Sequence, residues 1–242
     1  MQFYSLTDRG RLREKNQDYC MAKKIGDFTV LVLADGMGGH KGGEVASLKA
    51  IETIVNCLDE TFLKHIIPGQ IPSLISDIVN KANSTVYNLS LKDPSLKGMG
   101  TTLELCVIAE NTSYIAHIGD SRIYHITKEN ITKKTKDHSL VEYMIDTGDI
   151  TREEAANHPQ KNVITRALGI DADTKADISY FRVFKGDTIL LCSDGLTNML
   201  TEEQIFCVIS SAQSPKDCAH TLVRLANDAG GTDNISVVLA KI

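Results

Sequence analysis

Four acidic residues lie where apolar runs of this sequence end or begin. Three such runs end on an acid and a fourth acid precedes an apolar stretch; the four are Asp35, Asp120, Asp194 and Asp233. Short apolar runs bounded by glycine are typical of buried strands, so the carboxylates are expected at the rim of a core. Unpaired carboxylates gathered there would repel one another. Mg²⁺ and Mn²⁺ favour oxygen ligands and would remove that repulsion, which indicates a site for two or more ions.

A simpler interpretation exists for each Asp-Gly pair, because this dipeptide usually marks a turn. Asp35-Gly36 and Asp194-Gly195 both fit that interpretation when taken singly. Four acids with the same placement relative to apolar runs favour the metal site over unrelated turns.

The composition is that of an ordinary globular protein. The 242 residues are 42% hydrophobic and 24% charged, which suffices for a large core without disulfides. The net charge of −5 and the lack of a basic run with interleaved aromatic residues argue against a nucleic-acid partner. No apolar run approaches the roughly 18 residues of a membrane span, and the N-terminus does not resemble a signal peptide, so no membrane association is expected. Scattered cysteines without a Cys-x-x-Cys pair predict free thiols and a cytoplasmic location.

Hydrophobic periodicity predicts the elements that must position the acids. Strands are predicted at 2–8, 18–34 with a turn at 25–27, 101–109, 112–119, 121–127, 176–184, 188–193 and 234–241. Short turns between 101–109, 112–119 and 121–127 predict that these three strands are antiparallel neighbours. Helices are predicted at 43–66, from Pro72, after Thr151, after Thr201 and from Pro215. The pattern predicts an α+β fold in which a central antiparallel β-sandwich is flanked by helical layers.

Glycine-rich and polar corners accompany the acids. Arg13 begins the segment Arg13-Glu-Lys-Asn-Gln-Asp18, and its planar fork of donors could hold a phosphate. The small residues of Asp35-Gly-Met-Gly-Gly39 let backbone carbonyls and a helix start approach a ligand closely. Gly98-Met-Gly-Thr-Thr102 and Gly119-Asp-Ser-Arg122 are two further corners of this kind.

In this order, the segments resemble the motifs of the metal-dependent serine/threonine protein phosphatases of the type 2C family, in their compact bacterial form. The matching segments are Arg-x-x-Asn-x-Asp at 13–18, Asp-Gly-Met-Gly-Gly at 35–39, Gly-Thr-Thr at 100–102, Ile-Gly-Asp-Ser-Arg at 118–122, Ser-Asp-Gly-Leu at 193–196 and Gly-Thr-Asp-Asn-Ile at 231–235. Each motif alone is weak, but together they span most of the chain. The resemblance implies one catalytic domain over 1–242, with a flap beside the active site at about 136–170.

The resemblance also implies a catalytic centre with two Mn²⁺ or Mg²⁺ ions and a third, weaker one. Asp35 would bridge both ions of the core site, and the Gly36 carbonyl would bind one of them. Asp194 and Asp233 would complete the coordination of the other ion. Asp120, together with Asp194, matches the ligands of the third ion.

Further residues receive roles from the same resemblance. Arg13 would bind the phosphate, so that the implied catalytic residues are Arg13, Asp35, Asp194 and Asp233. Asp18 and Asn234 are expected to orient ligands or their turns through hydrogen bonds. From their own positions in the sequence, Arg122, close after Asp120, is expected to pair with an acid rather than bind phosphate, and His117, in an apolar run, to be a hydrogen-bonded core residue rather than a ligand.

The implied reaction is hydrolysis of phosphoserine and phosphothreonine on proteins by a metal-activated water. We expect phosphorylated proteins as partners, among them a Ser/Thr protein kinase whose action the phosphatase opposes, and we expect a monomer. The chain departs from some family members at Gln17, where they have Glu, and at Met37, where they have a histidine that is a candidate general acid. His40 is a candidate for that role or a surface histidine.

Other functions remain open at this point. A silent binding or regulatory domain could keep the fold, although such relatives should lose metal-binding acids that this chain has. A dedicated switch phosphatase could act on one phosphorylated regulator of transcription, although such relatives usually carry additional sensory domains.

Overall fold

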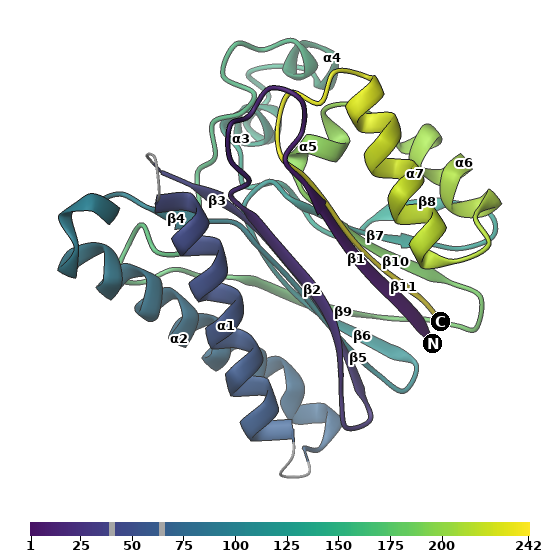
Figure 1. Ribbon diagram of the computed structural model, residues 1–242, viewed down its shortest axis with the longest axis horizontal. Coiled ribbons are helices and arrows are strands. Elements are labelled where there is room, and N and C mark those ends of the chain that lie inside the picture. Colours follow the sequence, from purple (N-terminus) through teal and green to yellow (C-terminus); the bar gives the residue numbers. More distant parts are fainter. Residues whose placement is uncertain (39–41, 63–65) are drawn as a thin grey trace.

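Two antiparallel sheets stack face to face in the residues that the computed structural model describes, which are 1–38, 42–62 and 66–242 (Figure 1). One sheet has the strand order β1 (Gln2–Asp8), β11 (Ile235–Lys241), β10 (Thr188–Cys192), β7 (Arg122–Ile126) and β8 (Ile131–Lys133). The other has the order β2 (Asp18–Ile25), β3 (Phe28–Met37), β5 (Leu103–Ala109), β6 (Thr112–Ile118) and β9 (Asp177–Arg182), with β4 (Gly100–Thr101) paired to the end of β3. The predicted α+β sandwich is confirmed.

Helices cover the outer face of each sheet. Helices α1 (Gly42–Phe62) and α2 (Ile71–Lys92) lie on the sheet that contains β2, and α6 (Glu202–Ser211) and α7 (Pro215–Asp228) lie on the other sheet (Figure 1). Short 3₁₀ turns at Pro68–Gln70 and Pro94–Leu96 precede and follow α2. No helix among the described residues is long and apolar enough to cross a membrane.

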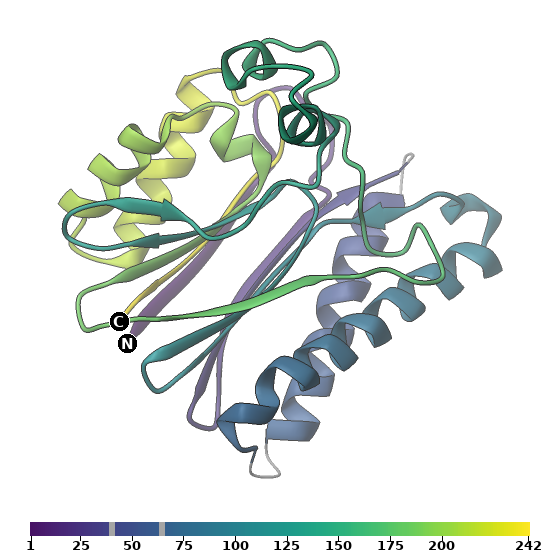
Figure 2. The same ribbon diagram turned by 180° about the vertical axis from the view of Figure 1, so that it is seen from behind.

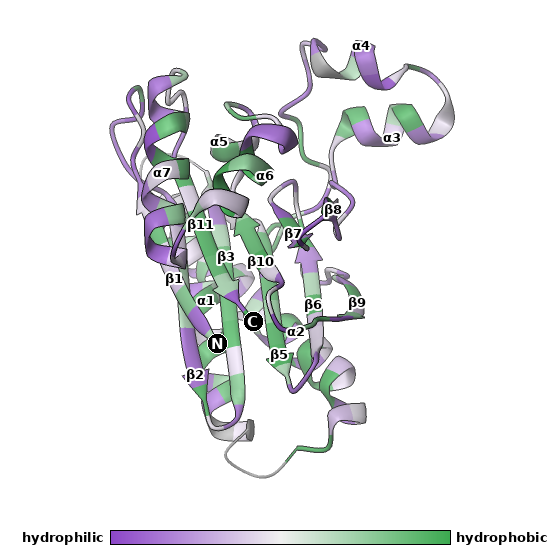
Figure 3. Ribbon diagram, turned by 90° about the vertical axis from the view of Figure 1, so that its right-hand side faces the viewer, coloured by the Kyte–Doolittle hydropathy of each residue, from purple (hydrophilic) through white to green (hydrophobic). Residues whose placement is uncertain are grey.

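The central strands are apolar on both faces because they are covered on both sides. In β3, Val30, Val32 and Ala34 pack beneath the helices, whereas Leu31 and Leu33 face the opposite sheet. Successive side chains on a strand point to opposite faces, so one continuous apolar run contributes to two apolar layers. The same apolar pattern on neighbouring strands is visible in Figure 3.

The flap consists of two short helices beyond the end of the sandwich. Helix α3 (Leu140–Thr147) is capped by Ser139 and ends at Gly148, and α4 (Arg152–Ala156) begins with the predicted capping box of Thr151 and Glu154. Both helices project past the sheets (Figure 3). The short helix after Thr151 was predicted from its cap, whereas α3 was not predicted.

One expected strand pairing is wrong. Strands β5 and β6 form the predicted hairpin, but β7 does not pair with β6; it lies in the other sheet beside β10. The reason lies at Gly119, whose φ of 115° sends the chain across from one sheet to the other instead of back along β6. This crossing places Asp120 at the end of the sandwich, between the sheets.

A buried asparagine fixes the segment that precedes β9. Asn83 of α2 donates to the carbonyls of Asp171 and Ala172, 3.0 Å away in each case, and accepts from the N–H of Gly169 at 2.7 Å. Figure 2 shows this segment running beside α2. The contacts hold the chain that continues from the flap.

We expect Asn83→Ala to lower the free energy of unfolding by about 1–3 kcal/mol, because it leaves the buried N–H of Gly169 and the partly buried carbonyls of Asp171 and Ala172 without their side-chain partner. Chemical denaturation followed by circular dichroism measures the change. Asn80→Ala, on the exposed face of the same helix, is the matched control. Equal losses in the two variants would contradict this role for Asn83.

Candidate metal centre

The predicted site residues meet at one end of the sandwich although they come from distant parts of the chain. Asp35 lies on β3, Asp120 at the crossing from β6 to β7, Asp194 at the start of α5 (Asp194–Thr197), and Asp233 in the loop before β11. They line a cavity of about 360 Å³, whose other lining residues are Arg13, Gln17, Gly36, Met37, Gly38, Thr102, Asn162, Ile164 and Asn234. Asp18 is buried nearby on β2, opposite Asp35 in the β2–β3 ladder.

Neither Asp-Gly pair of the metal-site hypothesis forms a simple turn. Strand β3 continues past the predicted end at residue 34, because Gly36 and Met37 pair with β4. Asp194 and Gly195 begin α5. The acids therefore lie on regular elements, whose positions the sheet fixes.

Two glycines allow the backbone to close around the acids. A Cβ atom on Gly36 would lie 2.1 Å from the carbonyl oxygen of Gly43, in the first turn of α1. A Cβ atom on Gly195 would lie 1.9 Å from the carbonyl oxygen of Asn234. No side chain fits at either position, so α1 and the loop before β11 can approach the carboxylates only with glycine there.

The carboxylate of Asp18 is the least compensated acid of the group. Asp18 and Asp35 are directly opposite each other on neighbouring antiparallel strands, where side chains share a face and like charges are destabilising. Both carboxylate oxygens of Asp18 are buried without a hydrogen-bond partner among the described residues. The nearby hydroxyls of Ser193 and Ser236 contact the Asn234 carbonyl and the Thr7 hydroxyl instead.

Burial and mutual repulsion raise the pKa values of Asp18, Asp35, Asp120 and Asp194. Burial, followed by the charge of Asp194, raises the pKa of Asp18 to about 7 and that of Asp120 to about 7. Burial and the charge of Asp233 raise the pKa of Asp194 to about 6. The pKa of Asp35 rises well above its ordinary value, through burial and the charges of all four neighbouring aspartates. A bound cation would reverse these shifts.

Arg13 contacts one of the acids. Its Nη2 atom lies 2.6 Å from Oδ2 of Asp233, while about half of its side chain is exposed. Among the described residues, no three or more His, Cys, Asp or Glu side chains are already oriented around one point as metal ligands, so a metal ion could bind at the aspartates only after side chains such as that of Asp233 reorient. The Asp233 carboxylate is engaged by Arg13 on one oxygen and by the Asn234 N–H on the other.

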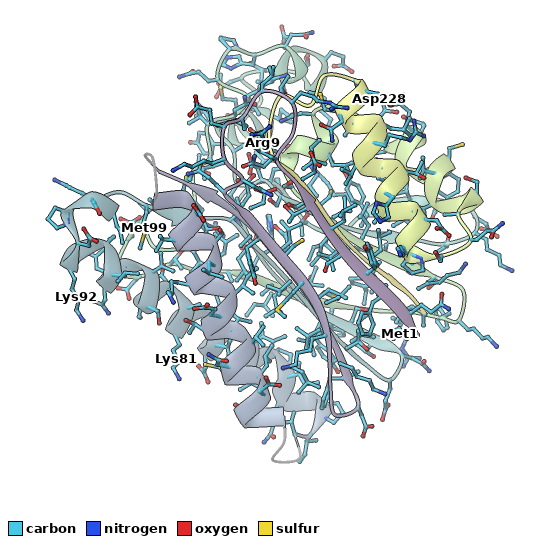
Figure 4. The ribbon with its side chains drawn as sticks, in the orientation of Figure 1. Met1, Arg9, Lys81, Lys92, Met99 and Asp228 are labelled. Carbon is cyan, nitrogen blue, oxygen red and sulfur yellow. The ribbon has the colours of Figure 1, made fainter. Side chains whose placement is uncertain are left out.

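Asn234 holds the loop that carries Arg13. Its side-chain oxygen accepts from the N–H of Gln17 at 2.8 Å, and its Nδ2 donates to the carbonyls of Arg9 and Lys15 at 2.9 Å each. Figure 4 labels Arg9 in this loop, near the end of the sandwich where Asp228 closes α7. The buried amide thereby ties the β1–β2 loop to the residue that follows Asp233.

The expectations for Arg122 and His117 are confirmed. Arg122 pairs with Asp137, with Nη2 and Oδ2 2.7 Å apart. His117 is buried, with Nδ1 2.6 Å from Oε1 of Glu104 and Nε2 2.8 Å from the carbonyl of Lys136. Burial raises the pKa of Glu104 and lowers that of His117.

The start of the flap is anchored next to Asp120. The backbone N–H of His138 donates to the carbonyl of Gly119 at 2.6 Å, and the N–H of Gly119 donates to Nδ1 of His138 at 3.1 Å. The His138 ring also packs against His117, with ring centroids 4.5 Å apart. These contacts fix the corner from which Asp120 extends.

Sequence reasoning missed the flap residues that line the cavity. Asn162 and Ile164 lie on the segment that returns from the flap. An antiparallel bridge between Ser139 and Ile164 holds this segment beside the start of the flap, and there both residues line the cavity. No local pattern marks them, since their position depends on the path of the whole flap. Thr102, in the Gly-Thr-Thr motif, supports Asp35, because its Oγ1 accepts from the N–H of Asp35 at 2.9 Å. Gly39 and His40 lie outside the described residues.

Known protein phosphatases resemble this chain over nearly its whole length. The family described as Protein phosphatase 2C matches residues 10–230. The protein phosphatase PhpP of Streptococcus pneumoniae serotype 2 is 39% identical over 244 residues, which cover 100% of this chain and 98% of that protein. The solved S. agalactiae serine/threonine phosphatase superposes with a TM-score of 0.94 at 36% identity, covering 100% of this chain and 99% of that chain. The catalytic domain of the phosphatase PstP, solved in complex with 2 manganese ions, superposes with a TM-score of 0.87 at 35% identity, covering 99% and 97%.

The raised pKa values predict how the stabilisation by Mn²⁺ depends on pH. Without metal, the folded chain keeps protons on Asp18, Asp120 and Asp194 that the unfolded chain releases above about pH 4. These groups therefore lower the free energy of unfolding as pH rises from about 4 to 7. Since metal ions bind the deprotonated carboxylates, we expect the rise in melting temperature on adding Mn²⁺ to be larger at pH 7.5 than at pH 5.

Differential scanning calorimetry with Mn²⁺ or EDTA at each pH measures this difference. The samples with Mn²⁺ and with EDTA are compared at the same pH, so protonation of the buried histidines affects both samples alike. The difference in melting temperature between the two samples therefore reports the carboxylates. A stabilisation that is independent of pH would contradict the prediction.

Proposed function

The chain belongs to the protein phosphatase 2C family and is a metal-dependent protein serine/threonine phosphatase, and we propose that its four clustered aspartates hold the metal ions. The observation that carries this proposal is the convergence of Asp35, Asp120, Asp194 and Asp233 on one cavity, with Asp18 buried behind Asp35. Clustered carboxylates that receive few hydrogen bonds from neighbouring donors are suitable ligands for hard divalent cations, which prefer oxygen.

The residues present fit such ions. Two oxygens of Asp18 and one of Asp194 are buried without a hydrogen-bond partner among the described residues. In the proposed arrangement Asp35 would bind both of two ions, the Gly36 carbonyl would bind one of them, and Asp194 and Asp233 would bind the other. Asp120 and Asp194 would take a third, weaker ion, and Asp18, which lies opposite Asp35 on the neighbouring strand, would orient the ligands once an ion is bound.

Arg13 and Asp233 exchange partners in this proposal. In the described arrangement they form an ion pair, which neutralises Asp233. When Asp233 turns to a cation, the guanidinium of Arg13 becomes available for the phosphate of the substrate. Arginine suits this role because its planar donors match phosphate oxygens in pairs. The exposed position of Arg13 at the mouth of the cavity supports it.

The proposed reaction needs a nucleophile, a held phosphate and a proton for the leaving group. Bound at this site, Mn²⁺ or Mg²⁺ supplies a water of lowered pKa and neutralises charge on the phosphate. Arg13 holds the phosphoryl oxygens, and Asn234 keeps the loop of Arg13 in place. Met37 lines the cavity and has no proton to donate, so the leaving alkoxide takes its proton from water or from another side chain.

The biological setting is also a proposal. We propose that the substrates are phosphoproteins in the cytoplasm, that they include a Ser/Thr protein kinase, and that the phosphatase acts as a monomer. The names of the relatives support the phosphoprotein substrates. The proposed single domain over 1–242 is supported by relatives that match the chain over nearly its whole length.

Asp194→Asn tests the metal ligands. We expect kcat/KM for a phosphothreonine peptide to fall at least ~100-fold, because a ligand charge is lost, whereas the metal-free melting temperature holds or rises because repulsion is relieved. Asp228→Asn, on the surface of α7, is the matched control. Full turnover by Asp194→Asn, or by the unchanged chain in EDTA, would contradict the proposal.

Arg13→Ala tests the phosphate contact. We expect KM for the phosphopeptide to rise roughly 10- to 100-fold, because charge-assisted hydrogen bonds to the phosphate are lost. Arg11→Ala, in the same loop, is the control for a general loss of positive charge. Titration with inorganic phosphate in the presence of Mn²⁺ should show weaker binding for Arg13→Ala only. An unchanged KM and phosphate affinity would exclude the assigned role.

A further inference from the structure

A second cavity, of about 450 Å³, adjoins the metal centre on the side where β3 ends. Met37 and Ile164 line both cavities. The other lining residues belong to the segment 165–175, which connects the flap to β9. Because the chain is a phosphatase that acts on proteins, its substrate has peptide on both sides of the phosphorylated residue. The start of this second cavity is therefore within reach of the residues that flank the phosphate.

The wall next to the metal centre is apolar and partly open to solvent. Met37 and Ile164 are partly exposed, and the side chain of Ile170 is 42% exposed. A Cβ atom on Gly100 would lie 2.8 Å from Cδ1 of Ile170 and 2.9 Å from Cε of Met37. The ends of these two side chains therefore meet over Gly100, where the absence of a side chain leaves room for both.

The exposed isoleucine is held by a fixed backbone. Leu168, two residues before Ile170, exchanges two backbone hydrogen bonds with Thr101, at 2.8 and 3.0 Å. The buried side chain of Asn83 accepts from the N–H of the residue before Ile170 and donates to the carbonyl of the residue after it. Because the chain is anchored on both sides, the apolar side chain of Ile170 stays at the cavity.

The charged residues of the described lining balance one another. They are the cations Arg166 and Lys175 and the anions Asp171 and Asp173. The guanidinium of Arg166 is already engaged, by the carboxylate of Asp177 at 2.8 Å and by the carbonyl of Lys175 at 3.0 Å. The cavity thus has no excess of either charge that would select an ionic group, and the apolar wall is the feature that distinguishes it.

We propose that this second cavity is a subsite for an apolar side chain of the substrate, about the size of leucine, located within a few residues of the phosphorylated one. The inference rests on the proposed function, since the metal centre positions the scissile phosphate. An extended peptide advances about 3.3 Å per residue, which brings neighbouring side chains to an adjoining cavity. An apolar side chain that covers Met37, Ile164 and Ile170 removes their exposed surface from water, and this favours binding.

The experiment compares phosphothreonine peptides that carry one variable residue at each of the three positions on either side. The variable residue is Leu, Gln, Glu or Lys, so that an apolar side chain is compared with neutral, negative and positive polar ones. Initial rates with Mn²⁺ give kcat/KM for each peptide. Hydrolysis of p-nitrophenyl phosphate by the unchanged chain reports the metal centre without a flanking peptide.

We expect a preference of about tenfold in kcat/KM for Leu over Gln at one or more positions, because only Leu buries apolar surface against the wall. Glu and Lys should give rates similar to those of Gln. The preference for Leu should persist at high salt, since salt screens charges but does not weaken apolar contacts.

Ile170→Ser should reduce the preference for Leu over Gln at least threefold, because it removes the most exposed part of the wall. Ile170→Leu keeps an apolar side chain there and should retain the preference. Val163→Ser is the matched control, since Val163 is 44% exposed on the same segment but does not line either cavity. The ratio of the two peptides is measured within each variant, so a change in the overall rate does not affect it.

Three results would overturn the subsite and leave the proposed function standing. The first is metal-dependent hydrolysis of p-nitrophenyl phosphate with no preference for Leu at any position. The second is a preference that Ile170→Ser retains in full or that Val163→Ser reduces equally. The third is a preference that disappears at high salt. Failure to hydrolyse p-nitrophenyl phosphate with any metal would instead overturn the proposed function, and the subsite with it.

Discussion

Electrostatic repulsion among partly buried carboxylates is the constraint around which this end of the molecule is organised. Asp18 and Asp35 lie opposite each other on neighbouring strands, and Asp194 and Asp120 approach them from the other sheet and from the crossing between sheets. Each gains little from hydrogen-bond donors, and burial strengthens the repulsion. The arrangement persists because the sandwich holds the backbone rigidly. In the proposed metal centre, divalent cations would convert the same repulsion into binding energy.

The rest of the fold holds these carboxylates in place against their mutual repulsion. The two sheets are fixed by continuous apolar layers, so that the ends of β3 and β10 cannot separate when their acids repel. Gly36 and Gly195 let the backbone of neighbouring elements close around the acids. Asn234 and the His138–Gly119 contacts attach the Arg13 loop and the flap to the same end. The proposed catalytic residues and the flap are thus held by one framework.

The sequence allowed most of the sandwich and the set of clustered acids to be predicted, because apolar runs and Asp-Gly corners are local signals. It did not predict that β7 would cross to the other sheet, since the φ of Gly119 and the long-range β7–β10 pairing decide that path. Asn162 and Ile164 were missed because only the folded path of the flap brings them to the cavity. The buried pair of Glu104 and His117 likewise depends on register between β5 and β6.

The most direct test of the central claim is diffraction from crystals grown with Mn²⁺, with anomalous scattering used to locate the ions. We expect two strong peaks that share Asp35, one of them also contacting Asp194 and Asp233, and a weaker third peak between Asp120 and Asp194. Asp233 should then have left Arg13. Mn²⁺ peaks that avoid Asp35, or no peak at this end of the sandwich, would contradict the assignment of the carboxylates as metal ligands.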